Sequence, residues 1–337
     1  MRFGIVVGPI GEARNVVPIA RAAEESGFEL LGLGDNQSLW RDVYVSLTLA
    51  ALETSKIGLG PSVTNIVTRD LAVTAGAIAS IDELSGGRAF LGLGPGDSAV
   101  FNVGLKPARL AEVESATHAL RAMLSGRSVT HDGRSMHVSW SQRRVPICLP
   151  AEGLKGLAMA GRAADATFVS FGLSPADVKT AAAHIAAGAA SVGRDPNAVE
   201  VWHAARVTIA STEAEAMQRA RSGMASVAHH ALRLAPEAKG VPDELIGPLG
   251  ELNAKYRPTD HARVGDTFNA RLVEDLGLMP YLTARYGLVG TPQQVAGRLS
   301  ELSRAGVERL LLMLSGPDVE AQVHAWRRDV LTSTGIA

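Results

Sequence analysis

Residues 84–97 read Leu-Ser-Gly-Gly-Arg-Ala-Phe-Leu-Gly-Leu-Gly-Pro-Gly-Asp, and no other stretch says more about the fold. We expect a helix to end at Ser85-Gly86-Gly87 and a short apolar strand to run from Ala89 to Leu93. The strand opens into the glycine turn Gly94-Pro95-Gly96, and the carboxylate of Asp97 follows directly. Glycines let the backbone approach a bound ring closely because they have no Cβ. In a strand–helix barrel this position lies on the face where chemistry occurs, so the pattern indicates a cofactor site.

Similar apolar segments recur along the chain, and helical patterns lie between them. They read as continuous apolar runs, which is typical of buried parallel strands. The segments are 3–8, 30–34, 57–63, 89–93, 145–149, 166–171, 200–209 and 308–314. Eight strands that each precede a helix predict an α/β fold, a single (β/α)8 TIM barrel.

Two insertions account for the length of the chain, which has 337 residues where a minimal barrel needs roughly 250. One spans about 95–144, after the fourth strand, and the other spans about 223–287, after the seventh strand. Both follow the carboxyl ends of strands, so we expect both to lie over the mouth of the active site. The sequence has no linker, which predicts one domain over residues 1–337.

Composition and net charge limit which binding partners and which cellular compartment we expect for this protein. A net charge of −1 gives no electrostatic reason to expect nucleic acid or an anionic membrane. No apolar run reaches the roughly 18 residues that a membrane span needs, and Met1 leads straight into a strand rather than a signal peptide. Cys148 is the single cysteine, which favours the cytoplasm. No group of residues has the spacing of a metal site.

Several motifs, in order, resemble those of the bacterial-luciferase-like superfamily. The residues that carry the resemblance are 22–28, Gly34-Asp35, 57–60, 84–88, 91–94, 161–166 and 289–295. The resemblance implies a TIM-barrel oxidoreductase that binds a flavin or deazaflavin ring at the carboxyl ends of the strands. It also implies a homodimer or a higher homo-oligomer and a small-molecule substrate.

Two segments resemble the methylenetetrahydromethanopterin reductase branch of that superfamily, which uses the deazaflavin coenzyme F420. They are Gly60-Pro61-Ser62-Val63-Thr64-Asn65 and Gly94-Pro95-Gly96-Asp97-Ser98. This favours F420-dependent hydride transfer to or from a small organic substrate. One alternative is a two-component monooxygenase that uses FMNH2 and O2, and another is a non-catalytic flavin-binding protein.

The resemblance also implies where the ring lies. At Ser62-Val63 the family places a non-proline cis peptide, in a bulge that supports the ring from behind. Thr64 and Asn65 then project toward the mouth and can bond the pyrimidine edge of the ring. The other expected ring contacts are Asp35, Gly94 and Gly96.

The loop after the fifth strand is the expected phosphate site. It comprises Ala151, Glu152, Gly153, Leu154 and Lys155. Free N–H groups at a helix start bind phosphate, and Lys155 can add a positive charge. The alternative is an ordinary loop with a solvated lysine. Gly172, after the sixth strand, is the expected second wall.

Asp97 and Asn36 are the candidate catalytic residues. Hydride transfer leaves charge on the substrate, and Asp97 can supply a proton if burial raises its pKa; alternatively it caps the helical turn near Ser98. Asn36 stands where many family members have a histidine, but an amide carries no proton near neutral pH. It can contact the ring edge or the substrate, or simply form a turn.

Arg69 and Arg285 are the candidate substrate-binding residues, because both are expected in loops on the open face. Either arginine can pair with an acidic substrate or with the polyglutamate tail of F420, and Arg69 can instead pair with Asp70. The sequence gives His229-His230 no functional role.

Overall fold

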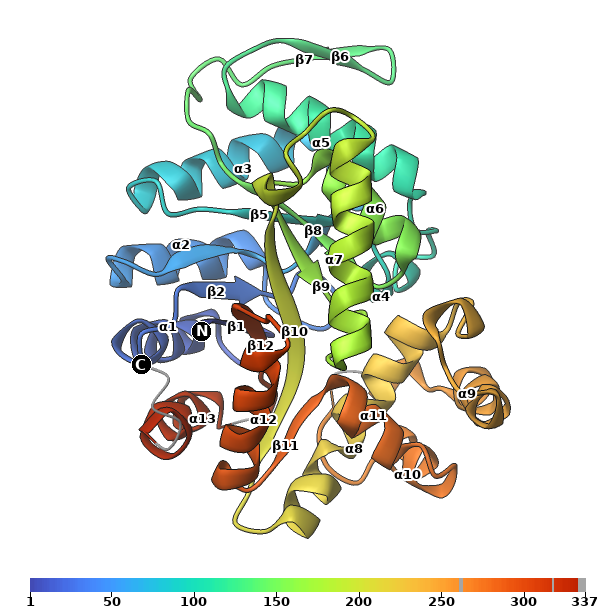
Figure 1. The fold of residues 1–337 in the computed structure, drawn as a ribbon. Coiled ribbons are helices and arrows are strands. Elements are labelled where there is room, and N and C mark those ends of the chain that lie inside the picture. The colour runs from blue at the N-terminus through green and yellow to red at the C-terminus, as the bar shows by residue number, and fades with distance from the viewer. Residues whose placement is uncertain (261–262, 317, 333–337) are drawn as a thin grey trace.

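Parallel strands form the centre of the molecule, and helices surround them (Figure 1). The computed structural model describes residues 1–260, 263–316 and 318–332. The parallel strands are β1 (Arg2–Val7), β2 (Leu30–Leu33), β3 (Gly58–Pro61), β4 (Thr64–Asn65), β5 (Leu91–Gly94), β8 (Ile147–Ala151), β9 (Ala166–Val169), β10 (Glu200–Ile209), β11 (Gly287–Gly290) and β12 (Arg309–Met313).

The strands pair in the order β3-β2-β1-β12-β10-β9-β8-β5-β4. A parallel bridge joins Leu59 of β3 to Ala89, just before β5, and the N–H of Phe90 donates to the Leu59 carbonyl at 2.9 Å. The ring therefore returns on itself, which confirms the predicted (β/α)8 barrel.

Alternate side chains of the strands fill the barrel, as the period of two requires. The interior residues are Val6, Phe90, Cys148, Ala166, Phe168, Trp202 and Leu311. Glycine allows β3 and β5 to approach: a Cβ on Gly92 would overlap the carbonyl oxygen of Pro61, and one on Gly60 would overlap that of Phe90. These glycines bring the third and fifth strands together.

The helices begin at capping residues that the sequence supplies. Asp42 caps α2 with its side chain, Asp70 caps α3, and Ser174 caps α7. The α-helices are α1 (Val16–Glu25), α2 (Val43–Glu53), α3 (Leu71–Leu84), α4 (Ser98–Phe101), α5 (Leu110–Leu124), α6 (Leu154–Ala163), α7 (Pro175–Ala190), α8 (Glu213–Leu232), α9 (Asp243–Lys255), α10 (Phe268–Asp275), α11 (Met279–Tyr286), α12 (Pro292–Arg304) and α13 (Val319–Ala325). Short 3-10 turns cover Ala13–Asn15, Pro196–Ala198, Glu237–Lys239 and Pro258–Asp260, and Trp326–Leu331 is a π-helix.

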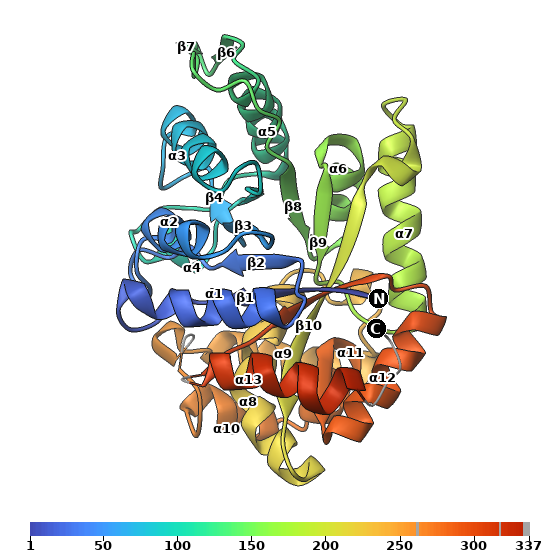
Figure 2. The ribbon, with the colours of Figure 1, turned by 90° about the vertical axis from the view of Figure 1, so that its left-hand side faces the viewer.

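The first insertion is only partly where we expected it. Its antiparallel hairpin, β6 (Val129–His131) with β7 (Arg134–Met136), packs on the outer side of α5 (Figures 1 and 2). Arg134 there pairs with Asp70 at 2.6 Å. The expectation that all of 95–144 covers the mouth is therefore wrong, because α5 carries the chain away from the carboxyl ends of the strands.

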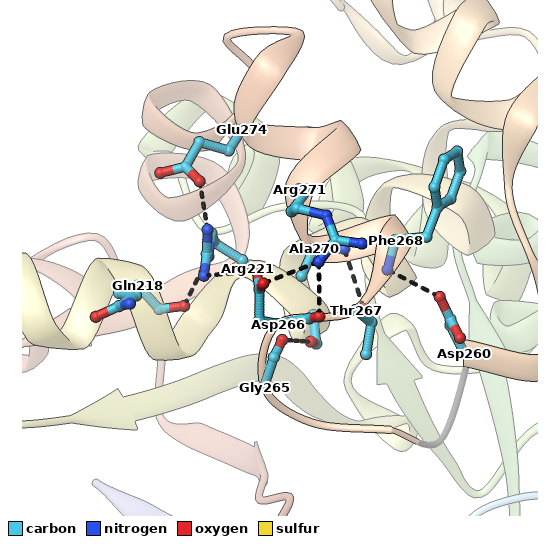
Figure 3. A network of polar contacts seen from close by, with 11 residues as sticks. Gln218, Arg221, Asp260, Gly265, Asp266, Thr267, Phe268, Ala270, Arg271 and Glu274 are labelled. Carbon is cyan, nitrogen blue, oxygen red and sulfur yellow. Dashed lines mark hydrogen bonds and ion pairs between the residues drawn. The ribbon is translucent and has the colours of Figure 1, made fainter.

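The second insertion consists of α8 to α11, which share a hydrophobic cluster of their own. Arg221 on α8 pairs with Glu274 on α10 and lies 3.4 Å from Asp266 (Figure 3). These contacts fix α8 relative to α10. The strand β11, which pairs with β10 from Arg206 to Ile209, was not predicted from the sequence.

Among the residues that the structure describes, none of the helices is long and apolar enough to cross a membrane.

Candidate active site

A cavity of about 1310 Å³ opens at the carboxyl ends of the barrel strands. The loops after β2, β3, β5, β8 and β12 line it, and α8 of the second insertion lines it from another side. It is therefore where a barrel enzyme carries its chemistry. Residues 95–99 and 107–110 are the parts of the first insertion, besides Phe101, that reach it.

The bulge after β3 lies in this cavity. The peptide bond between Ser62 and Val63 is cis, as the family resemblance implied, and residues 62–65 all line the cavity. A Cβ on Gly94 would lie 3.0 Å from Val63 and 3.2 Å from Pro150. Gly94 itself is not among the lining residues, and what the structure shows for it is that it makes room for the bulge.

The edge of this bulge is polar and internally bonded. Thr64 Oγ1 donates to Asp35 Oδ2 at 2.6 Å. Burial raises the pKa of Asp35, although Thr64 and Arg69 oppose the rise. Asn65 Oδ1 accepts the N–H groups of Val67 and Thr68 at 2.9 and 2.8 Å, so the Nδ2 group is the donor that Asn65 has left for a ligand.

The start of α6 has the features of an anion site. Gly153 is its N-cap, no side chain caps the helix, and its first turn holds no acidic residue. The N–H groups of such a turn lack intrahelical partners. Glu152, Gly153, Leu154 and Lys155 line the cavity there, and so does Lys239. A Cβ on Gly153 would lie 3.3 Å from Lys239 Cε, so two lysines are near these N–H groups.

Asp97 forms an ion pair with His230, a residue of α8. Its Oδ2 contacts His230 Nδ1, and its Oδ1 lies 3.6 Å from Arg233 Nη1. Burial alone would raise the pKa of Asp97, but the hydrogen bond and charge of His230, with Arg233, outweigh it, so the pKa is lowered. The expectation of a raised pKa is therefore wrong, and Asp97 is a carboxylate near neutral pH. Its side chain does not cap α4 either.

Residues 1–309 match the family model described as luciferase-like monooxygenase. The chain belongs to this family. It is 32% identical to the 5,10-methylenetetrahydromethanopterin reductase of Methanolobus tindarius, over 98% of this chain and 100% of the relative. It is 30% identical to the F420-dependent hydroxymycolic acid dehydrogenase of Mycobacterium tuberculosis, over 54% of this chain and 55% of that one.

The fold also matches a solved structure of the family. The coenzyme F420 dependent tetrahydromethanopterin reductase from Methanopyrus kandleri superposes with a TM-score of 0.79 at 24% identity, and 98% of each chain is covered. This likeness establishes the fold, a luciferase-like barrel.

Asn36 of this luciferase-like protein is not exposed to the cavity. It is 2% exposed, its Nδ2 donates to Ser98 Oγ at 2.8 Å, and its Oδ1 accepts the N–H of Ser38 at 3.0 Å. Asn36 does not line the cavity, so the expected contact with ring or substrate is not observed. It ties the loop after β2 to the residue that follows Asp97.

The two candidate substrate arginines are placed elsewhere. Arg285 lies in helix α11 rather than a loop and is 5% exposed; its Nη2 contacts Asp177 Oδ1 at 2.9 Å and the carbonyl of Lys239 at 2.6 Å. Arg69 pairs with Asp42 at 3.0 Å. Neither lines the cavity. Each guanidinium already has a protein partner, so the placement does not favour the expected substrate contacts.

Gly172 and Ala151 are likewise structural. Gly172 has a φ of 143°, and a Cβ there would overlap the carboxylate of Asp177. Ala151 is buried beneath the loop that follows it. Both lie outside the lining of the cavity, whereas the predicted residues Asp35, Gly96 and Asp97 line it.

Three residues that line the cavity were not predicted as site residues: Arg206, His230 and Lys239. One signal was available for the wall formed by α8. Ser222, Ser226 and His230 are four residues apart, the spacing of one helix face, and all three line the cavity.

Proposed function

We propose that this protein is an oxidoreductase that uses coenzyme F420 to transfer a hydride to or from a small organic substrate. The observation that carries the proposal is one cavity with the Ser62-Val63 bulge on one side and the Asp97–His230 pair on another. The relatives' names, a reductase and an F420-dependent dehydrogenase, support the same chemistry. F420, when bound, accepts or supplies the hydride and does not activate O2 usefully.

The residues present fit this cofactor. The cavity, at about 1310 Å³, exceeds the roughly 300–1,000 Å³ that one drug-sized ligand occupies, so it has room for a ring and a substrate. The ring would rest on residues 62–65, with Asn65 Nδ2 at its edge. The phosphate of its side chain would lie on the uncapped start of α6, near Lys155.

His230 and Asp97 carry out the proton transfer that accompanies hydride transfer. Reduction of a C=O or C=N group places a hydride on carbon and a proton on the heteroatom, and oxidation reverses both. In this proposal His230 gives or takes this proton, while Asp97 contacts its Nδ1. Asp97 is then a positioning residue that holds the imidazole in place, as a carboxylate does beside a catalytic histidine.

A titration of the purified protein tests the proposal. F420, FMN and FMNH2 are added separately while fluorescence quenching and the midpoint of thermal unfolding are followed. We expect tight F420 binding with little FMN affinity. The first substrate to assay for turnover is 5,10-methylenetetrahydromethanopterin, after the name of the Methanolobus tindarius relative. Preference for FMNH2 with oxygen uptake would identify a monooxygenase, and binding without turnover of any screened substrate would identify a carrier.

The protein further acts as a cytoplasmic homodimer in this proposal. Large apolar side chains are exposed on the neighbouring helices α2 and α3, namely Val45, Leu52, Val73 and Leu84. A group of such side chains on a surface typically marks an interface. Light scattering should give twice the chain mass, and Leu52→Lys with Val73→Lys should give the chain mass. Val192→Lys, an exposed apolar position after α7, serves as the control.

A further inference from the structure

Arg206 lies on the inner face of β10, where that strand meets the cavity. Trp202 and Arg206 are four residues apart on the strand, so their side chains share one face. Trp202 packs inside the barrel, and Arg206 lines the cavity above it, as does Met313, its partner in register on β12. The guanidinium therefore belongs to the wall of the cavity.

No protein group neutralises this side chain. Its Nε atom is buried and lacks a hydrogen-bond partner, and over residues 1–260, 263–316 and 318–332 no hydrogen bond or ion pair involves the side chain of Arg206. Tyr256 and, less strongly, Glu152 act on the guanidinium only through longer-range electrostatics. An arginine is effectively always protonated, so a positive charge is kept in the wall without an anion, which costs free energy.

Two other arginines, the buried Arg285 and the partly buried Arg88, have several hydrogen-bond partners each. Arg285 contacts Asp177 and two backbone carbonyls. Arg88 donates to the carbonyls of Ser85, Ile57 and Thr54. The lack of partners is thus particular to Arg206, the one of these three that lines the cavity.

The surroundings of Arg206 leave space for a ligand. Gly223 of α8 faces it, and a Cβ at that position would lie 3.9 Å from Arg206 Cδ. Ser222 and Ser226 flank this glycine and line the cavity, but the hydroxyl of Ser222 donates to the Gly265 carbonyl. The donors offered to a ligand are therefore those of the guanidinium, whose planar shape is suited to two oxygen atoms of a carboxylate or a phosphate.

We propose that Arg206 binds an anionic group, a carboxylate or a phosphate, of the ligand in this cavity. The anion can belong to the substrate or to the side chain of the cofactor. Only this choice of source rests on the proposed function; the anion site itself does not.

Thermal unfolding with simple anions tests the site. Phosphate and malonate are titrated at constant ionic strength into the wild type, Arg206→Met, Arg206→Lys and Arg219→Met. Arg219 lies on α8, pairs with Glu215 and is exposed, so its variant removes the same charge away from the cavity. We expect both anions to raise the midpoint of the wild type and of Arg219→Met most, that of Arg206→Lys less, and that of Arg206→Met least, where only the start of α6 remains as an anion site.

The variant without added anion gives a second, independent readout. Because Arg206 has no protein partner, Arg206→Met should be at least as stable as the wild type. A lower midpoint for Arg206→Met would show that the arginine has a structural role and would overturn the proposal. Failure of both anions to stabilise the wild type, or an equal response in Arg206→Met, would also overturn it.

Binding of F420 and of its deazaflavin core, which lacks the phosphate side chain, identifies the source. A loss of about tenfold for F420 in Arg206→Met, with the core unaffected, assigns the anion to the cofactor. If Arg206→Met binds F420 and the core as tightly as the wild type does, but responds less to phosphate, the anion belongs to the substrate. Loss of core binding would mean that Arg206 shapes the ring pocket and would refute the anion site. Absence of F420 binding to the wild type would refute the proposed function alone.

Discussion

Asp97 after β5 holds the Nδ1 atom of His230 on α8, so a barrel loop and an inserted helix meet at one ion pair. The pair lies in the wall of the cavity at the carboxyl ends of the barrel strands. The contact engages Nδ1 of the imidazole, so each of the two side chains helps to position the other.

Asp97→Asn should lower turnover by about 100-fold or more, the typical contribution of general acid–base catalysis. The amide keeps the size of the side chain but cannot hold a charged imidazole. Affinity for F420, followed by fluorescence, should change little. Asp132→Asn, on the exposed hairpin turn, is the control, and unchanged turnover in Asp97→Asn would remove Asp97 from the mechanism.

His230→Gln should lower turnover by a similar factor. The double variant with Asp97→Asn should have a turnover little lower than that of either single variant. Residues that act as one unit give non-additive effects. Steady-state kinetics of the four proteins form the cycle. Losses that simply multiply would mean that the two residues act independently.

Asp35→Asn should stabilise the folded protein at neutral pH. Burial raises the pKa of Asp35 in the folded state, so the folded protein binds the proton more tightly than the unfolded chain does. Stability from this group is fully present below the unfolded pKa and is lost as the pH rises through the folded pKa. The asparagine still accepts the hydrogen bond from Thr64, so its advantage in urea unfolding should appear at pH 7 and vanish near pH 3.

Gly92→Ala should destabilise the protein by about 2 kcal/mol or more, in the upper range for overpacking. The added methyl group would overlap the carbonyl of Pro61, which belongs to β3. Gly297→Ala, on an exposed face of α12 with open space around it, should instead gain roughly 0.5–1 kcal/mol. Equal changes in the free energy of unfolding for the two variants, measured in denaturant, would contradict the close approach of β3 and β5.

Arg285→Met should cost about 3–5 kcal/mol, because it leaves the carboxylate of Asp177 without its partner. Arg69→Met breaks a surface pair with Asp42 and should cost about 1 kcal/mol or less. Urea unfolding of both variants measures the contrast. A small loss for Arg285→Met would mean that solvent reaches Asp177.

The barrel could be predicted because its strands are continuous apolar runs with helices between them, and each of the eight expected strands is present. β11 was missed because Gly287-Leu288-Val289-Gly290 is short and follows a helix directly. Its pairing with β10 depends on the long seventh strand, which extends past the barrel. No local pattern encodes that partner.

The site was predictable where it follows a strand and unpredictable where it does not. Residues 62–65 and Asp97 follow the ends of strands, and they line the cavity as expected. Arg285 is buried because helices from distant parts of the chain pack around it. The sequence placed it in an exposed loop, and no local pattern indicates this packing. His230 was missed because the face of α8 that meets the cavity is decided by contacts such as that of Arg221 with Glu274.

The β6–β7 hairpin, which Arg134 joins to Asp70, lies away from the cavity. Helix α8, in contrast, forms one of the walls of the cavity. The bulge at residues 62–65 and the wall formed by α8 thus come from separate stretches of the gene. Substitutions on the cavity face of α8 that spare His230 would reshape one wall and leave the sequence of the bulge unchanged.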